Sequence, residues 1–187
     1  MIFARLSKNQ TSYSNIKFKD VKPSDWFYNA VKIGAEQGFI NGYTDKTFKP
    51  DSPITRAEFA SVISTYARKE ASKQTFFDVN GWATDAINTA FVNGWMQGYN
   101  NEFRPDDLLT RAEAVTVINR MLNRNPDKEF INNQLLLSMS NSLFFTDIKS
   151  NDWYFYDVYG ASWGHDYIIE NGTEKWTRLN GKAFNIN

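Results

Sequence analysis

The residue with the clearest chemical potential in this 187-residue chain is an arginine that occurs twice in the same setting. Arg56 lies in the stretch TRAE at residues 55–58, and Arg111 lies in an identical stretch at residues 110–113. An arginine fork can bind a carboxylate or a phosphate through two hydrogen bonds, and free N–H groups at a helix start favour the same anions. The motif therefore predicts an anion receptor. An exposed arginine whose long stem packs on its neighbours is the alternative that stays open.

The other polar residues of the motif are explained by helix capping. Thr55 can accept a hydrogen bond from the N–H of Glu58, while the Glu58 carboxylate accepts one from the N–H of Thr55. Thr110 and Glu113 can form the same capping box. Behind each box, over residues 59–66 and 114–121, apolar residues follow the spacing of an amphipathic helix. Each motif is therefore predicted to open a helix.

Catalysis and metal binding have weak support in the sequence. Glu58 and Glu113 could form a carboxylate pair for glycoside hydrolysis, but the capping boxes already account for both. The single histidine, His165, precedes Asp166 without a recognisable serine nucleophile, which favours a structural histidine. The stretch 44–47 has too few ligands for a calcium loop. We expect no enzyme activity, no metal and no cofactor.

Charge and hydropathy exclude further classes of partner. The 21 basic and 21 acidic residues cancel, which leaves no net field to attract nucleic acid. No apolar run approaches the roughly 20 residues that span a bilayer, so membrane insertion is not expected either. The N-terminus lacks the apolar core of a signal peptide, and an exported protein would carry that signal outside this sequence. The absence of cysteine excludes disulfides and thiolate metal sites.

The elements that must position the two arginines repeat along the chain. A Phe-x-Asp-Val stretch precedes Trp26 and Trp82, and a Gly-Tyr turn, a Phe-x-Pro-Asp loop and the capping box then follow in the same order. A third Phe-x-Asp precedes Trp153, but no glycine turn and no box follow it. Each complete unit is predicted to be a helix, a glycine turn, an extended loop and a second helix.

These repeats divide the chain into five predicted parts. Residues 18–73 and 74–124 are complete repeats, residues 125–144 are a connection, and residues 145–187 are a divergent partial repeat. The apolar residues at positions 2–6 match the end of a capped helix, so residues 1–17 are assigned to the tail of a preceding repeat. The predicted fold class is all-α, with tandem helix–loop–helix repeats.

The ordered set of motifs resembles the S-layer homology (SLH) repeat over about residues 18–124. The resemblance implies a pseudo-threefold helical bundle that attaches proteins, without covalent bonds, to the wall of a bacterial cell. It implies a location at the cell surface, in the cell wall or in an S-layer. It also implies that Arg56 and Arg111 lie in grooves between repeats and bind the pyruvate ketal of a secondary cell-wall polysaccharide. A modified peptidoglycan is the other ligand left open, and a third groove would lack its arginine.

The repeated aromatic residues suit a sugar ligand, which needs flat apolar faces beside a few fixed polar groups. Trp26, Trp82, Tyr43 and Tyr99 could supply such faces. The alternative for the tryptophans is a core position at the start of each helix. The tyrosines, next to glycine in a turn, are expected to be partly exposed.

The turn residues complete the candidate binding set. Gly42 and Gly98 could let a ligand approach the backbone, although a positive φ would explain them equally well. Asp45 and Asn101 lie in the same two turns and are candidate ligand contacts. A helical-repeat module that binds a protein partner on a concave face, with no carbohydrate ligand, stays open as the alternative function.

Overall fold

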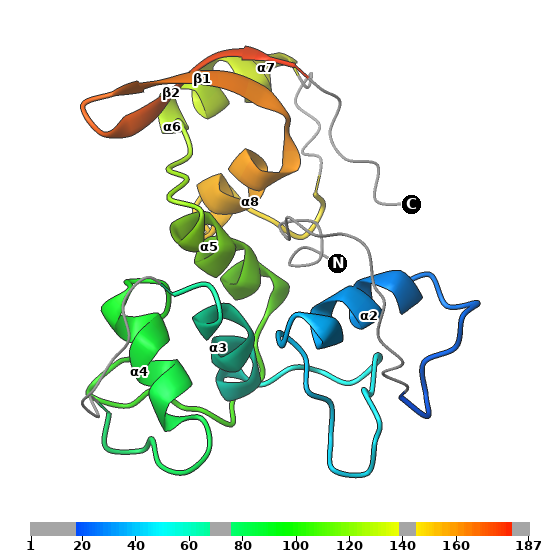
Figure 1. Cartoon of the computed structure of the whole chain (residues 1–187). Coiled ribbons are helices and arrows are strands. Elements are labelled where there is room, and N and C mark those ends of the chain that lie inside the picture. The colour runs from blue at the N-terminus through cyan, green and yellow to red at the C-terminus, as the bar shows by residue number, and fades with distance from the viewer. Residues whose placement is uncertain (1–17, 68–75, 139–144, 181–187) are drawn as a thin grey trace. The chain divides into compact units, whose positions relative to one another are not determined.

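The computed structural model describes residues 18–67, 76–138 and 145–180 (Figure 1). The chain forms two compact units, Met1–Leu109 and Thr110–Asn187. The predicted tail of an earlier repeat, at residues 1–17, lies outside the described residues.

Unit 1 contains the helices α2 (Tyr28–Glu36), α3 (Arg56–Ser64) and α4 (Thr84–Val92). Helix α3 packs against α4, as Figure 1 shows. Ala60 and Ile63 of α3 and Ile87 and Ala90 of α4 are at most 1% exposed. The apolar stripe behind the first capping box therefore forms part of the core of this unit.

An aspartate holds the loop between the helices in each repeat. Asp20 accepts hydrogen bonds from the backbone N–H groups of Phe48, at 2.8 Å, and Lys49, at 2.7 Å. In the second repeat Asp78 accepts from Phe103 and Arg104 at the same two distances. The Phe-x-Asp stretch at the start of a repeat therefore fixes the Phe-x-Pro-Asp loop near its end.

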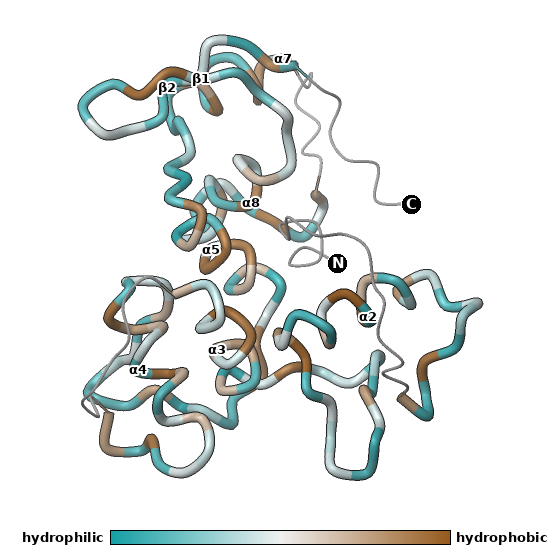
Figure 2. The backbone as a smooth tube through the Cα atoms, in the orientation of Figure 1, coloured by the Kyte–Doolittle hydropathy of each residue, from teal (hydrophilic) through white to brown (hydrophobic). Residues whose placement is uncertain are grey.

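Unit 2 begins with helix α5 (Arg111–Met121), which packs against α8 (Phe155–Ser162). In the sequence, the segment between α5 and α8 contains α6 (Lys128–Phe130), the π-helix η1 (Ile131–Leu135) and α7 (Leu136–Ser138). Figure 2 shows hydrophobic and hydrophilic residues mixed along α5, as an amphipathic helix requires. Within the described ranges, no helix combines the length and the apolar character needed to cross a membrane.

The prediction of an all-α fold is wrong, because unit 2 contains a β-hairpin. Strands β1 (His165–Glu170) and β2 (Thr173–Leu179) pair antiparallel, from His165 opposite Leu179 to Glu170 opposite Thr173. The two-residue turn consists of Asn171 and Gly172, with φ values of 51° and 77°. Asn-Gly favours such a turn because both positions need positive φ. The divergent third copy thus continues as a hairpin, where the complete repeats have a loop and a second helix.

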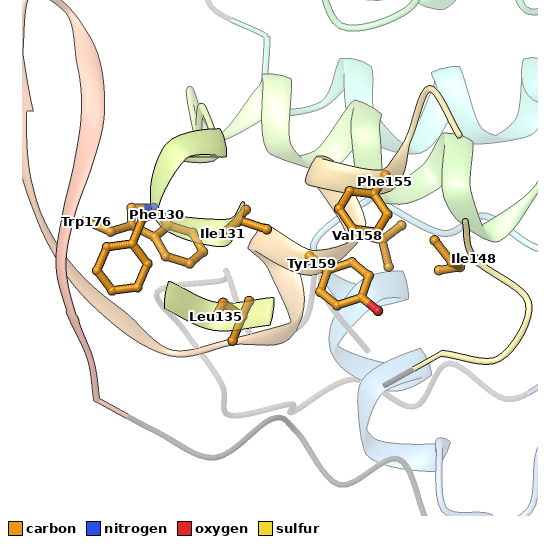
Figure 3. Close-up of a cluster of buried hydrophobic side chains, with 8 residues drawn as sticks. All are labelled: Phe130, Ile131, Leu135, Ile148, Phe155, Val158, Tyr159 and Trp176. Atoms are coloured by element: carbon orange, nitrogen blue, oxygen red, sulfur yellow. The ribbon is translucent and has the colours of Figure 1, made fainter. Parts of the chain in front are cut away.

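The hairpin is tied to the unit through a buried cluster, drawn in Figure 3. Trp176 of β2 lies 5.6 Å from Phe130, centroid to centroid. The other members come from the connection, from α8 and from the stretch just before α8, and they are Ile131, Leu135, Ile148, Phe155, Val158 and Tyr159. The connection after α5 therefore supplies core residues that the repeat pattern does not contain.

Candidate binding groove

A groove with a volume of ≈ 730 Å³ lies in unit 1. The first repeat lines it with residues 39–44, 48–50 and 52–54 and with Glu58, Ser61 and Val62 of α3. The second repeat contributes Trp82. Of the residues predicted to bind a ligand, the structure brings Gly42, Tyr43 and Trp82 to this groove.

Tyr43 is fixed in the groove by two charged neighbours. Its hydroxyl donates a 2.7 Å hydrogen bond to Oε1 of Glu58, and Nζ of Lys49 lies 4.1 Å from its ring centroid. The bond to Glu58 raises the pKa of Tyr43. Burial works to raise the pKa of Glu58, but hydrogen bonds from Thr55 and Tyr43 outweigh it, so the pKa is lowered. The groove therefore contains an ionised carboxylate whose acceptors are already in use.

Tryptophan occupies the same exposed position in all three copies. Trp26, Trp82 and Trp153 each lie two residues before a helix, and their exposed fractions are 78%, 73% and 64%. The alternative that they are core anchors is therefore wrong. Trp82 lines the groove, whereas Trp26 does not.

The repeated glycines make room for a phenylalanine ring. A Cβ atom at Gly42 would lie 2.3 Å from Cε1 of Phe18, and one at Gly98 would lie 2.2 Å from Cε1 of Phe76. Gly42 also has a φ of 67°. Ring packing within each repeat thus explains both glycines, and Gly98 does not line the groove.

Arg56 is 7% exposed and does not line the groove. Its Nε donates to the carbonyl of Phe103 at 2.9 Å, and its Nη2 donates to the carbonyl of Gln97 at 2.8 Å. The guanidinium carbon lies 4.6 Å from the Phe103 ring centroid. Arg56 therefore joins the second helix of the first repeat to the loop of the second repeat.

The backbone at the start of α3 is occupied as well. The N–H of Arg56 donates to the carbonyl of Asp107, and the N–H of Ala57 donates to that of Pro105, both at 2.9 Å. Thr55 and Glu58 form the reciprocal capping box. The expectation of free N–H groups beside Arg56 is therefore wrong, because the next repeat takes them.

The start of α5 differs, although its sequence is the same. Thr110 and Glu113 form the capping box, and Arg111 is exposed. Among the described residues, none accepts a hydrogen bond from the guanidinium or the backbone N–H of Arg111. The third copy has no Phe-x-Pro-Asp loop, and that loop supplies the carbonyls that bind Arg56.

The remaining predicted residues lie outside the groove. Asp45 accepts from the N–H of Thr47 at 3.0 Å and from its hydroxyl at 2.6 Å, and the side-chain bond is the larger cause of its lowered pKa. Asn101, with a φ of 65°, matches Lys46, with 66°, rather than Asp45. Tyr99 is 74% exposed.

Lys49 is the basic residue that lines the groove, and it was not among the residues predicted to bind. It has a φ of 55°, and its counterpart Arg104 has 58°. A left-handed conformation is uncommon for such residues. A basic residue inside both Phe-x-Pro-Asp loops was the signal available in the sequence.

Comparison with known proteins agrees with the repeat pattern. The family described as "S-layer homology domain" matches residues 17–60 and 76–115. The chain is 38% identical over 188 residues to a cellulosome-anchoring protein of Acetivibrio thermocellus, covering 93% of this chain and 40% of the relative. It is 34% identical to cell surface glycoprotein 1 of the same organism, covering 96% of this chain and 8% of the relative.

An enzyme is also among the relatives. Endo-1,4-beta-xylanase A of Thermoanaerobacterium saccharolyticum is 33% identical over 104 residues, which cover 54% of this chain and 9% of the relative. The chain thus spans less than half the length of each of these relatives. Residues 17–60 and 76–115 are thus two S-layer homology domains.

Proposed function

We propose that this chain anchors the protein that carries it to the bacterial cell wall, without covalent bonds, by binding a pyruvylated secondary cell-wall polysaccharide. The two S-layer homology domains and the cell-surface relatives place the chain at the cell surface and support an anchoring role. The observation that carries the finer proposal is the groove of unit 1, where the exposed residues Trp82 and Tyr43 lie with Lys49. The proposal assigns the chain no reaction.

The aromatic residues would bind the sugar ring in this groove. Trp82 offers a large apolar face that remains accessible in the free protein. The Tyr43 ring is held in one orientation by Glu58, so little freedom is lost when a ligand packs on it. Both residues would contribute apolar contact and shape.

Lys49 would bind the ketal carboxylate. It is the basic residue that lines the groove, whereas Arg56 keeps two guanidinium donors on backbone carbonyls. In this proposal Arg56 acts indirectly by holding the loop of the second repeat. Arg111 is proposed as a second carboxylate receptor, since its side chain is exposed at a helix start where, among the described residues, none accepts from its backbone N–H.

Purified cell walls provide the test. The 187-residue chain should co-sediment with intact walls, and mild acid that removes the ketals should abolish binding. Lys49→Asn keeps a residue that tolerates positive φ and removes the charge, so affinity should fall about ten- to a hundredfold. Lys46→Asn is the matched control, because Lys46 has a φ of 66° and lies outside the groove.

The tryptophans give a second matched pair. Trp82→Ala should weaken wall binding, while Trp26→Ala, which removes an equally exposed ring outside the groove, should not. Equal binding to walls with and without ketals would contradict the proposal. Equal effects of the two substitutions in either pair would contradict the choice of groove.

A further inference from the structure

Unit 2 contains a second cavity, unrelated to the groove of unit 1. Its volume is ≈ 550 Å³, and it lies between the end of α5 and the β-hairpin. Arg124, Trp163, His165, Tyr167, Glu174 and Asn180 are among the residues that line it. The hairpin that replaces the second half of the third repeat therefore builds a concave surface of its own.

The tautomer of His165 follows from its hydrogen bond. Its side chain is 3% exposed, and Nδ1 lies 2.9 Å from the carbonyl oxygen of Trp163. A carbonyl oxygen only accepts, so Nδ1 carries the proton. Burial is the main cause of a lowered pKa at His165, and together with Arg124 it outweighs the Trp163 carbonyl and Glu174, which raise the pKa. The imidazole is therefore neutral at pH 7, and Nε2 presents a lone pair.

Nε2 faces a second acceptor. It lies 3.7 Å from Oε2 of Glu174, whose side chain is 5% exposed, and this separation exceeds a hydrogen bond. Within the described part of the chain, Oε2 of Glu174 has no hydrogen-bond partner. An unpaired polar atom costs free energy when it is buried. Nε2 of His165 and Oε2 of Glu174 would both be satisfied by a ligand that donates a hydrogen bond to each.

The other lining residues define the kind of donor. The lining contains one basic residue, Arg124, and one acidic residue, Glu174, so neither kind is in excess and the lining favours a neutral ligand. Trp163 and Tyr167 add aromatic rings, and Asn180 adds an amide. A cavity of this size is ordinary for a small-molecule site. We propose that it binds an uncharged sugar residue, whose hydroxyl groups donate to Glu174 and His165 while its ring packs on the aromatic side chains.

His165 reports on this site directly, because it is the single histidine in the chain. In the full chain labelled with 15N-histidine, uncharged methyl pyranosides of the gluco, galacto, manno and N-acetylglucosamine series should be titrated at pH 7. At least one should shift the Nε2 signal saturably, and Trp82→Ala should not alter that response. The outcome is therefore independent of wall binding by unit 1.

Glu174→Gln is the decisive variant. The new amide can donate to Nε2 of His165 and so replace the missing donor from within, so the variant should be as stable as the parent. Its affinity for the pyranoside should fall about tenfold or more. Glu170→Gln, on an exposed residue of the same hairpin, should change neither property. Tyr167→Ala removes a half-exposed ring and should weaken binding without unfolding the unit.

Three results would overturn the inference. The first is the absence of a saturable shift with every pyranoside. The second is a signal typical of imidazolium at pH 7, since a charged His165 would itself donate to Glu174. The third is a shift of the Nε2 signal with glucosamine, added as a cationic probe, but with none of the uncharged pyranosides. The site would then select a cation.

Discussion

Arg56 donates a hydrogen bond from Nε to the carbonyl of Phe103 and also lies over the ring of that residue. The two residues belong to different repeats and are separated by 47 positions. An arginine that looks like a ligand receptor in the sequence therefore serves as a connection inside unit 1. Replacing the arginine should therefore affect the stability of the protein differently in the two identical TRAE stretches.

Arg56→Ala should lower the free energy of unfolding by about 3 kcal/mol, because the buried carbonyl of Phe103 and the partly buried carbonyl of Gln97 lose a charged donor. Arg111→Ala should change it by about 0.5 kcal/mol or less, since the side chain is exposed. Chemical denaturation of both variants measures the difference. Similar values for the two would show that the environment of Arg56 is not the one described here.

Gly98→Ala should destabilise unit 1 by about 2 kcal/mol or more, because the new Cβ would lie 2.5 Å from the carbonyl oxygen of Glu102 as well as against Phe76. Gly94→Ala is the control. Gly94 has a φ of 75° with nothing near its Cβ position, so its cost of about 1 kcal/mol comes from the backbone alone. Thermal melts should rank Gly98→Ala below Gly94→Ala, and the reverse order would contradict the packing explanation.

The hydrogen bonds that Asp20 accepts from the backbone of Phe48 and Lys49 should make the stability of the protein depend on pH. Hydrogen bonds from Phe48 and Lys49 lower the pKa of Asp20 in the folded state, so its contribution is complete above the unfolded pKa of about 3.9. That contribution is lost as the pH falls through the lower, folded value. Asp20→Asn should lower the melting temperature at pH 7 and flatten its decline below about pH 4. Asp51→Asn, at an exposed position, should leave the curve unchanged.

Tyr43 allows the ring and the hydroxyl to be tested separately. Tyr43→Phe removes the hydrogen bond to Glu58 and should cost about 1 kcal/mol of stability, while wall affinity changes little. Tyr43→Ala also removes the ring and should weaken wall binding clearly. If both variants bind walls like the parent, Tyr43 is not a ligand contact.

Local patterns predicted the local structure well. Thr55 and Glu58 form a capping box because both partners lie within one helical turn, and the same is true of Thr110 and Glu113. The hairpin was missed although its turn, Asn171-Gly172, is a strong hairpin signal. The complete repeats have a loop and a second helix at this place, so the repeat pattern contains no hairpin.

Long-range contacts could not be predicted in this way. The acceptors of Arg56 are separated from it by 41 and 47 residues in the sequence. Spacing patterns within a helix or a strand cannot predict contacts over such separations. Repetition even misled, because equal motifs suggested equal roles for Arg56 and Arg111. The exposure of Trp26 and Trp82 could not be predicted either. The spacing of apolar residues predicts which face of a helix a residue occupies, but not whether another element packs on that face.

The contacts at the start of α3 also bear on how such a domain can be copied and shortened. Two backbone and two guanidinium donors of residues 56 and 57 are satisfied by carbonyls of the following repeat. A gene segment that encodes one repeat is thus a unit of duplication but not a unit of folding. Excision of the second repeat would remove the carbonyls that accept from Arg56 and from the N–H groups of residues 56 and 57. Recombination should therefore preserve these two repeats as a pair or supply a different terminal cap.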